Sequence, residues 1–215
     1  MEIITDIEKL NAIGRCKEVD LEKGLKEARE VISNLKRTLR KNDNIVALSA
    51  PALGYDKRIF CIDYSDNEIK TYINPVVTNA TGMQLSREVC SSLPGKEFIR
   101  PRNKTVDIIY QKPTGEINTL HFKGVSACVI QHEIDHLEGV NLSDIGLEID
   151  SDFDEATDEE RQEIIDMYLD SLDLQRKELE EDIENNAELK IISDRLKFTE
   201  ALARGDIKLE KVDNE

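Results

Sequence analysis

Two of the three histidines in this 215-residue chain stand four residues apart, at His132 and His136, and Glu133 follows the first of them. Residues four apart share one face of an α-helix, so both imidazoles can reach one divalent metal ion. Glu133 is rotated just enough to address a water on that metal. The alternative is a pair of histidines on an ordinary helix face, but in a chain so poor in histidine the spacing favours a metal site.

A catalytic metal usually has three protein ligands and one open position, so a further ligand is expected elsewhere in the chain. Cys128 lies four residues before His132 but eight before His136, about 12 Å along a helix axis, which is too far for all three to converge easily. We therefore predict that Cys128 is a small core residue. Cys90 follows a strand-like segment and precedes Pro94-Gly95, which suits a thiolate held at a bend, although taken alone it could equally be a buried core cysteine.

The segments around these residues predict a mixture of helices and short strands. We expect Asp20 to cap a helix whose apolar positions recur at steps of three and four as far as Leu39. The helix of the histidine pair is expected to open near Gly124 and to close near Gly139. The order of helix, strands and helix predicts an α+β domain. Runs rich in β-branched and aromatic residues, separated by Gly, Pro and Asp-Asn turns, predict strands at residues 44–51, 58–63, 71–77, 105–111 and 119–122.

The net charge of −16 is confined to the C-terminal part of the chain. Residues 1–143 hold 20 acidic and 20 basic side chains, so the remaining 72 residues account for the whole imbalance. Such a segment is repelled by nucleic acid and by anionic membranes, and we expect neither as a partner. We divide the chain into a metal-binding domain, residues 1–150, and an acidic helical extension, residues 151–215.

The extension has the pattern of two amphipathic helices. Thr157 and Glu160 form a capping-box signature at the start of the first helix, and the second, residues 184–205, ends at Gly205. The simplest interpretation is a solvated extension, and the alternative is association with a protein partner or a second copy through residues 157–204. The apolar stripe of the first helix consists of Ile165, Tyr168, Leu172, Leu179 and Ile183.

The composition predicts a soluble, cytoplasmic protein. Hydrophobic residues make up 39% of the chain and charged residues 34%, and no apolar run approaches the roughly 18 residues that a membrane span needs. The N-terminal sequence lacks the basic start and long apolar core of a secretory signal. The four cysteines have no framework spacing, so we expect free or metal-bound thiols in a reducing compartment.

Three short motifs, in the family's order, resemble those of the peptide deformylases. The third motif, Gln-His-Glu-x-Asp-His, is intact at residues 131–136. The second, Glu-Gly-Cys-Leu-Ser, is altered to Glu-Val-Cys-Ser-Ser at residues 88–92. The first, Gly-φ-Gly-φ-Ala-Ala-x-Gln-φ-Gly with φ apolar, is altered to IVALSAPALG at residues 45–54. The resemblance covers roughly residues 1–145.

The resemblance implies antiparallel sheets around a central metal-binding helix, followed here by the acidic C-terminal extension. It implies a hydrolase that removes the formyl group from N-formylmethionine on nascent peptides during protein biosynthesis. The ligands of its single divalent metal would be Cys90, His132 and His136. In the family that metal is ferrous iron, readily replaced by zinc or nickel, and a Cys-His₂ donor set accommodates each of them. Glu133 would handle the proton of the metal-bound water, and the backbone N–H of Ser91 would help to bind the oxyanion.

Two departures from the family pattern bear on activity. Ala52 stands where the first motif has a glutamine that donates a hydrogen bond to the oxyanion, and losing such a donor costs on the order of 10²–10³ in rate. Val89 replaces a glycine, and a β-branched residue there is expected to narrow the groove beside the metal. Two hypotheses follow: an active deformylase-like metallohydrolase, and a catalytically impaired protein of the same fold that acts as an adaptor or structural subunit through its acidic helices.

Overall fold

A computed structural model describes residues 2–64 and 68–185 of the chain. The chain forms two compact units, Met1–Ser151 and Asp152–Glu215. The first unit combines helices with antiparallel sheets, so the α+β class expected from the sequence is confirmed. The motif residues and the histidine pair all belong to this unit.

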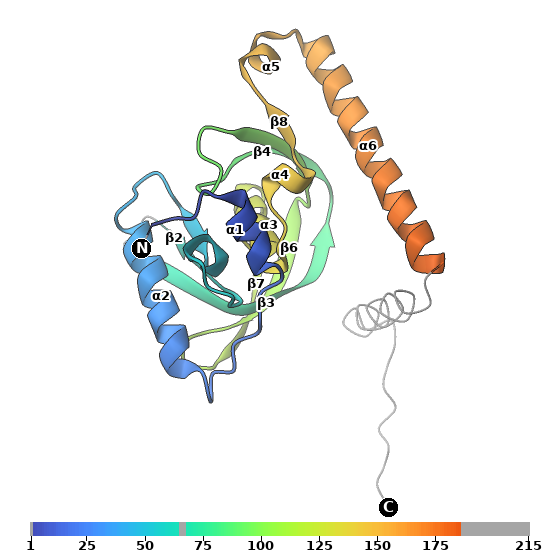
Figure 1. The fold of residues 1–215 in the computed structure, drawn as a ribbon. Helices are drawn as coiled ribbons and strands as arrows, with labels where there is room; N and C mark the ends of the chain where they lie inside the picture. Colours follow the sequence, from blue (N-terminus) through green and yellow to red (C-terminus); the bar gives the residue numbers. More distant parts are fainter. Residues whose placement is uncertain (1, 65–67, 186–215) are drawn as a thin grey trace, which may run out of the picture. The chain divides into compact units, whose positions relative to one another are not determined.

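The first unit contains two antiparallel sheets (Figure 1). A five-stranded sheet has the order β1-β2-β3-β6-β7, and a three-stranded sheet has the order β4-β5-β8. The strands are β1 (Ala47–Ser49), β2 (Ile59–Asp63), β3 (Ile69–Thr81), β4 (Gln84–Val89), β5 (Glu97–Arg102), β6 (Thr105–Gln111), β7 (Ile117–Lys123) and β8 (Leu147–Ile149). The helices are α1 (Ile7–Ile13), α2 (Leu25–Leu39), the 3₁₀ helix η1 (Ala50–Leu53), α3 (Val125–Glu138), α4 (Leu142–Ile145), α5 (Ser151–Glu155) and α6 (Asp158–Asn185).

Helix α3 is the element around which the first unit is built. It packs against β1, β7 and η1 on one side and against β5 of the smaller sheet on another, and Figure 1 shows it inside the unit. Ala127, Ile130 and Leu137 are fully buried in a cluster with the inward residues of β6. Gly124 precedes the helix, and Gly139 ends it in the left-handed conformation, with φ of 79°. The predicted helix limits are therefore confirmed.

Helix α2 packs against β2 and β1 at one end of the larger sheet, but it begins later than predicted. Its apolar stripe is buried against β1, β2 and η1. Asp20 does not cap this helix, because its Oδ1 accepts hydrogen bonds from the N–H groups of Glu22 and Lys23 in a separate turn. Gly24 closes that turn through its N–H to the Asp20 carbonyl (2.7 Å) and has a non-helical φ of −104°, so α2 starts at Leu25.

Strands β4, β5 and β8 form a sheet that sequence patterning indicated only at β4. The sequence of β5, Glu-Phe-Ile-Arg-Pro-Arg, lacks the apolar alternation typical of strands. Its two arginines form ion pairs, Arg100 with Asp135 at a partly exposed position and Arg102 with Glu88 in the interior. The predicted strand at residues 44–51 is reduced to β1, and the chain turns into η1 at Ala50, one residue before Pro51.

The second unit is described as far as Asn185. Thr157 and Glu160 form the predicted capping box: the Thr157 N–H donates to Glu160 Oε2 (2.8 Å), and the Glu160 N–H donates to Thr157 Oγ1 (3.3 Å). The predicted second helix, residues 184–205, lies outside the described residues except for Glu184 and Asn185, which belong to α6. The side chains of Leu179 and Ile183 also lie outside the described part of the chain, as does Gly205.

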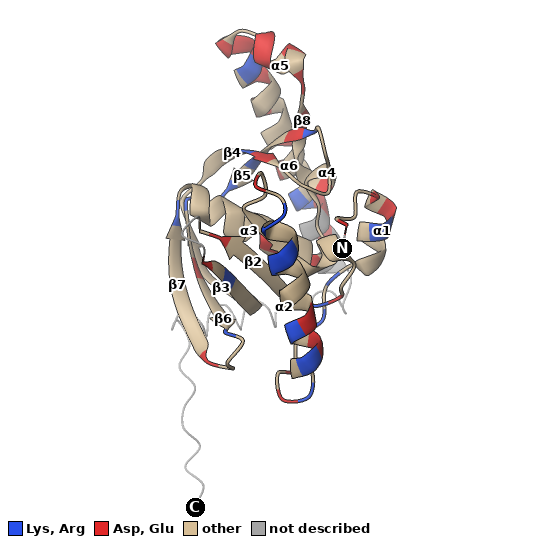
Figure 2. Ribbon diagram, turned by 90° about the vertical axis from the view of Figure 1, so that its left-hand side faces the viewer, with Lys and Arg blue, Asp and Glu red and all other residues tan. Residues whose placement is uncertain are grey.

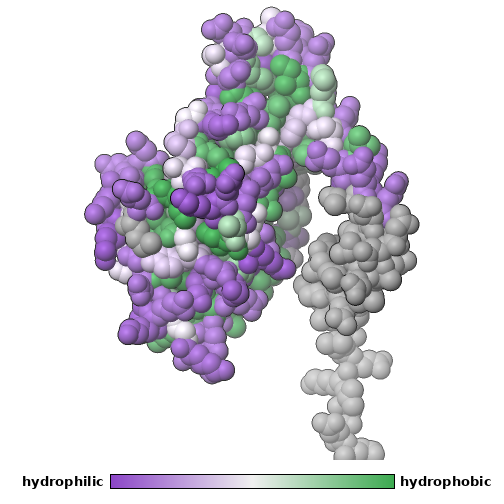
Figure 3. All heavy atoms as spheres, in the orientation of Figure 1, coloured by the Kyte–Doolittle hydropathy of each residue, from purple (hydrophilic) through white to green (hydrophobic). Residues whose placement is uncertain are grey.

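The two units differ in surface charge, as Figure 2 illustrates. Acidic residues gather on α5, whereas α2 carries both signs. Hydrophobic side chains show between hydrophilic ones on the face of the first unit in Figure 3. No helix within the described residues is long and apolar enough to span a membrane.

Candidate metal centre

A thiol and two imidazoles from distant parts of the chain meet at the surface of α3. The Sγ of Cys90 lies 3.3 Å from Nε2 of His136, and that nitrogen lies 3.2 Å from Nε2 of His132. All three donor atoms lie within 4.8 Å of one another. The structure therefore brings together the three residues that the family resemblance implied as metal ligands.

Local structure explains how these side chains converge. His132 and His136 are one helical turn apart on α3, and their rings are 4.8 Å apart between centroids. Cys90 follows the last residue of β4, where the chain turns back, and its carbonyl accepts a hydrogen bond from the Leu93 N–H (2.9 Å). Cys90 and His136 are buried, and His132 is half-buried. The predicted bend before Pro94 thus presents the thiol to the helix.

Each imidazole is held through its other ring nitrogen. Nδ1 of His132 lies 3.0 Å from Oε2 of Glu88, which accepts a further hydrogen bond of 2.8 Å from Arg102. Nδ1 of His136 lies 3.1 Å from Oδ1 of Asn141. Metal-binding histidines are usually oriented in this way, because an acceptor at one nitrogen leaves the other free to coordinate.

The charges at the centre are arranged to favour a thiolate. Burial opposes ionisation of Cys90, but hydrogen bonds from His132 and His136 outweigh it and lower its pKa to about 5. Burial likewise opposes the charge on Glu88, but Arg102 and His132 lower its pKa to about 2. For His132, contacts with Cys90 and Glu88 outweigh burial and raise the pKa to about 10. A divalent metal would replace the imidazole proton.

Glu133 lies beside the ligands with an unsatisfied carboxylate oxygen. It is only 4% exposed, and burial raises its pKa. Among the described residues, neither Glu133 Oε2 nor Ser49 Oγ makes a hydrogen bond, although the Ser49 hydroxyl is close enough to lower the pKa of the carboxyl. A buried polar group without a partner is costly, so its presence at a cavity points to a role in chemistry.

The ligands open onto a cavity of about 720 Å³. Ala52 and Ser91 line its wall, together with Val89, whose side chain is 66% exposed. Val89 therefore stands at the rim of an open cavity and does not fill it, and the expected narrowing relative to glycine stays a prediction. Nor does its backbone need glycine, because Asn74 is the one described non-glycine residue with a positive φ.

The residues that support the ligands were largely missed from the sequence. Glu88 was noted only as part of a motif, and Arg102 carried no signal, because it contacts Glu88 from another strand. Asn141 is only five residues from His136, but it lies beyond the end of the helix, where helical spacing no longer predicts a contact. Asp135 belongs to the intact third motif and forms ion pairs with Arg100 and Arg102. Cys128 is buried, as predicted, with its Sγ 3.0 Å from Nε2 of Gln84.

The donor set fits a divalent transition metal. One thiolate and two neutral imidazoles are three protein ligands of the kind found at catalytic sites, and the adjoining cavity leaves room for an open position. Fold and site together define an α+β protein with the features of a metallohydrolase.

Comparison with known proteins gives the family. The sequence model described as Polypeptide deformylase matches residues 2–146. The peptide deformylase of Dictyoglomus turgidum is 34% identical over 147 residues, which cover 68% of this chain and 95% of that protein. The peptide deformylase of Thermotoga maritima, a crystal structure, is 28% identical with a TM-score of 0.60 and is matched over 66% of this chain and 95% of its own. A deformylase from a Vibrio parahaemolyticus bacteriophage, solved in complex with actinonin, is also 28% identical, with a TM-score of 0.58, 66% of this chain and 99% of its own.

The chain belongs to the peptide deformylase family. Membership of this family places the chain among the hydrolases.

Proposed function

We propose that this protein removes the formyl group from N-formylmethionyl peptides, using one ferrous or zinc ion held by Cys90, His132 and His136. The observation that carries the proposal is the convergence of these three donor atoms within 4.8 Å. Glu133, next to one ligand in the sequence, completes the set of groups that the hydrolysis of an amide needs.

The roles of the residues follow from their places around the cavity. The metal, when bound, supplies a Lewis acid that lowers the pKa of a water and polarises the formyl carbonyl. Glu133 takes a proton from the attacking water, because its buried Oε2 has no other described partner. The water oxygen then bonds to the formyl carbon.

Breakdown of the tetrahedral intermediate returns the same proton. Glu133 donates it to the amide nitrogen as the bond between carbon and nitrogen breaks, so formate and a free amino terminus leave. The backbone N–H of Ser91, directly after Cys90 in the cavity wall, is assigned to the oxyanion. With Ala52 in place of the family's glutamine, the oxyanion has one donor fewer, and we expect a slow enzyme.

The direct test is turnover of formyl-Met-Ala-Ser by the full chain, purified without oxygen and analysed for metal. We expect formate release by the wild type and none by Glu133→Gln, which keeps the size of the side chain but cannot accept the proton. Actinonin, the compound bound in the phage relative, should compete with the peptide. A wild type that carries metal but releases formate no faster than Glu133→Gln would refute the proposal.

The second candidate function is that of an impaired deformylase-fold protein that binds a partner through its extension. Ala52 favours this function, because a glutamine that donates a hydrogen bond to the oxyanion is missing there. In addition, Met167 is 73% exposed on the acidic helix α6 and is available to a partner. A partner with a basic surface fits this charge. Two results together would favour this second function. The full chain would hold metal but show no turnover, and a chain without residues 151–215 would no longer bind a partner that the full chain binds.

A cytoplasmic location is part of the same proposal. The four cysteines, Cys16, Cys61, Cys90 and Cys128, are free and buried, as expected of a protein from a reducing compartment. A reducing compartment also protects a thiolate ligand, because oxidation would remove it from the metal.

A further inference from the structure

The two candidate ligands on α3 are held by acceptors of different chemistry. His132 contacts the carboxylate of Glu88, which is part of an ion-pair network, whereas His136 contacts the neutral amide of Asn141. Asn141 is only 5% exposed and lies just beyond the C-terminal end of the helix, after Gly139. Its partners therefore decide how the second imidazole is presented.

The amide oxygen fixes the tautomer of His136. Oδ1 of Asn141 can only accept a hydrogen bond, so Nδ1 of His136, 3.1 Å away, carries the proton. In the neutral imidazole, the form that binds a metal, Nε2 is then left with its lone pair facing Cys90 and His132. A reversed amide would place two N–H donors against Nδ1 and would favour the proton on Nε2, where it would block coordination.

Asn11 of α1 opposes that reversal. Nδ2 of Asn141 donates to Oδ1 of Asn11 at 2.7 Å, so with Asn11 in this orientation a reversed Asn141 would place two amide oxygens against each other. The Asn141 backbone is fixed as well, because its N–H donates to Oδ2 of Asp144 at 2.7 Å in the capping box of α4. Asn141 is thus held in this orientation by residues from both ends of the first unit.

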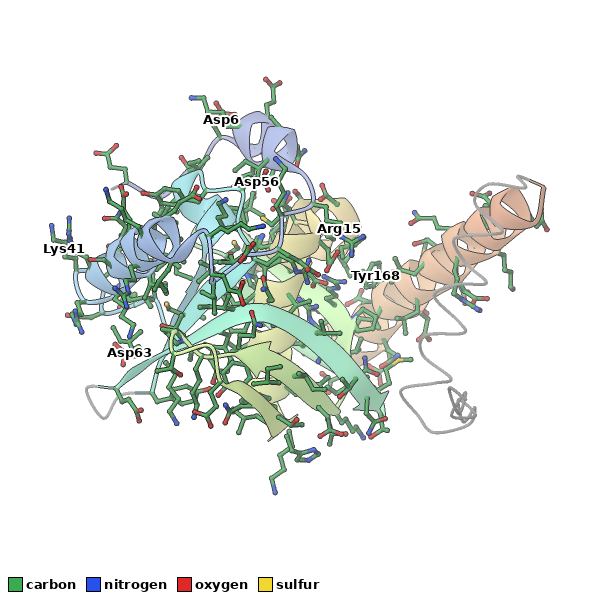
Figure 4. All side chains as sticks on the ribbon, turned by 90° about the horizontal axis from the view of Figure 1, so that it is seen from below. Asp6, Arg15, Lys41, Asp56, Asp63 and Tyr168 are labelled. Atoms are coloured by element: carbon green, nitrogen blue, oxygen red, sulfur yellow. The ribbon has the colours of Figure 1, made fainter. Side chains whose placement is uncertain are left out.

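The segment that carries Asn11 is tightly joined to the end of α3. A Cβ atom on Gly139 would lie 2.7 Å from the carbonyl carbon of Gly14, so the two backbones touch at this point. The Cys16 N–H donates to the Leu137 carbonyl (2.8 Å). Figure 4 shows Arg15 beside α3, and its Nε lies 2.8 Å from Oε2 of Glu138.

We propose that Asn141 is the positioning residue of His136 and that Asn11 locks its orientation, so that the N-terminal helix α1 sets how tightly the metal is held. The inference rests on the proposed metal function of Cys90, His132 and His136. It extends the centre to a helix that contributes no ligand and whose residues carry none of the three sequence motifs.

The test measures metal affinity rather than activity. Zinc affinity of the full chain is determined by competition with a chromophoric chelator for the wild type, Asn141→Leu, Asn141→Asp and Asn11→Ala. Loss of a hydrogen-bond partner behind a ligand typically lowers affinity about 10- to 100-fold, which we expect for Asn141→Leu. Asn141→Asp keeps the acceptor and should stay near the wild type, and Asn11→Ala should lose severalfold. The absorption of the cobalt-substituted protein should shift in Asn141→Leu but not in Asn141→Asp.

The control is Asn79→Ala, which removes a comparable side-chain amide, bonded to Asp107, from the sheet surface. It should bind zinc like the wild type. Thermal unfolding in the presence of a chelator checks that each variant folds. If Asn141→Leu does not fold, the zinc affinity of Asn11→Ala is the deciding measurement. The inference would be overturned if folded Asn141→Leu bound zinc as tightly as the wild type and its cobalt spectrum did not shift. If Asn141→Leu does not fold, wild-type zinc affinity in Asn11→Ala would overturn it. A wild type that binds no zinc through Cys90 would instead overturn the proposed function beneath it.

Discussion

Restoring the missing oxyanion donor is the sharpest test of how the open cavity works. Ala52 lies in η1, only 5% exposed, and lines the cavity beside Glu133 and the candidate ligands. Its carbonyl accepts a hydrogen bond from the Ile4 N–H (2.9 Å), which helps to fix the backbone of η1. A glutamine at this position therefore starts from a well-held backbone next to the reaction site.

The expected size of the effect of Ala52→Gln comes from two opposing terms. An oxyanion donor contributes on the order of 10²–10³ in rate, or about 3–4 kcal/mol in the transition state. Enlarging a buried side chain costs about 1–3 kcal/mol where the surroundings must shift. Because the new side chain can extend into a cavity of about 720 Å³, part of that cost is avoided. We expect a net rise of at least tenfold in kcat/KM.

The rise should fall on kcat, because the donor acts on charge that develops only in the transition state. Deformylation of formyl-Met-Ala-Ser is measured for the wild type, Ala52→Gln and Ala52→Met, which has similar length but no donor. The methionine variant should gain nothing. Equal rates for all three metal-loaded proteins would refute the reasoning and would favour the function as a binding subunit.

Elemental analysis should find near-stoichiometric divalent metal in the wild type and almost none after Cys90→Ala or His132→Ala, and equal content in all three would remove the ligand assignment. In metal-free protein, pH 7 is above the Cys90 pKa of about 5, so Cys90 is a thiolate. Burial raises the pKa of Cys61 to about 11, so the Cys61 thiol stays protonated at this pH. Iodoacetamide should label Cys90 first, and zinc should slow that labelling; equal rates at the two thiols would contradict the pKa order. A chain ending at Asp150 should stay folded and bind metal, since α3 and β4 precede that residue. Loss of a cooperative melting transition in that chain would mean that the extension is part of the core.

Local sequence was sufficient to predict α3 and the histidine pair that it carries. The helix limits at Gly124 and Gly139 depend on backbone preferences of single residues, and the pairing of His132 with His136 depends only on helical geometry. The prediction that Asp20 caps a helix was wrong for a reason that is also local. An aspartate side chain accepts backbone hydrogen bonds in a turn as readily as at the start of a helix.

The supporting shell could not be read from the sequence, because it depends on contacts between distant elements. Arg102 is nearly fully buried in β5 and would be expected on a surface, yet Glu88 and Asp135 surround its charge. The place of Val89 could not be predicted for a similar reason: whether it fills or borders a cavity depends on which way its strand faces in the assembled sheet.

The bond between Asn11 and Asn141 has a consequence for the order in which the protein folds. It joins residues 130 positions apart, and closing a loop of that length in an unfolded chain costs on the order of 4 kcal/mol. The contact therefore forms after other pairings have brought the ends of the first unit together. During synthesis α1 leaves the ribosome early, but this contact cannot form until α3 and α4 have been made, although α1 also contacts the earlier helix η1.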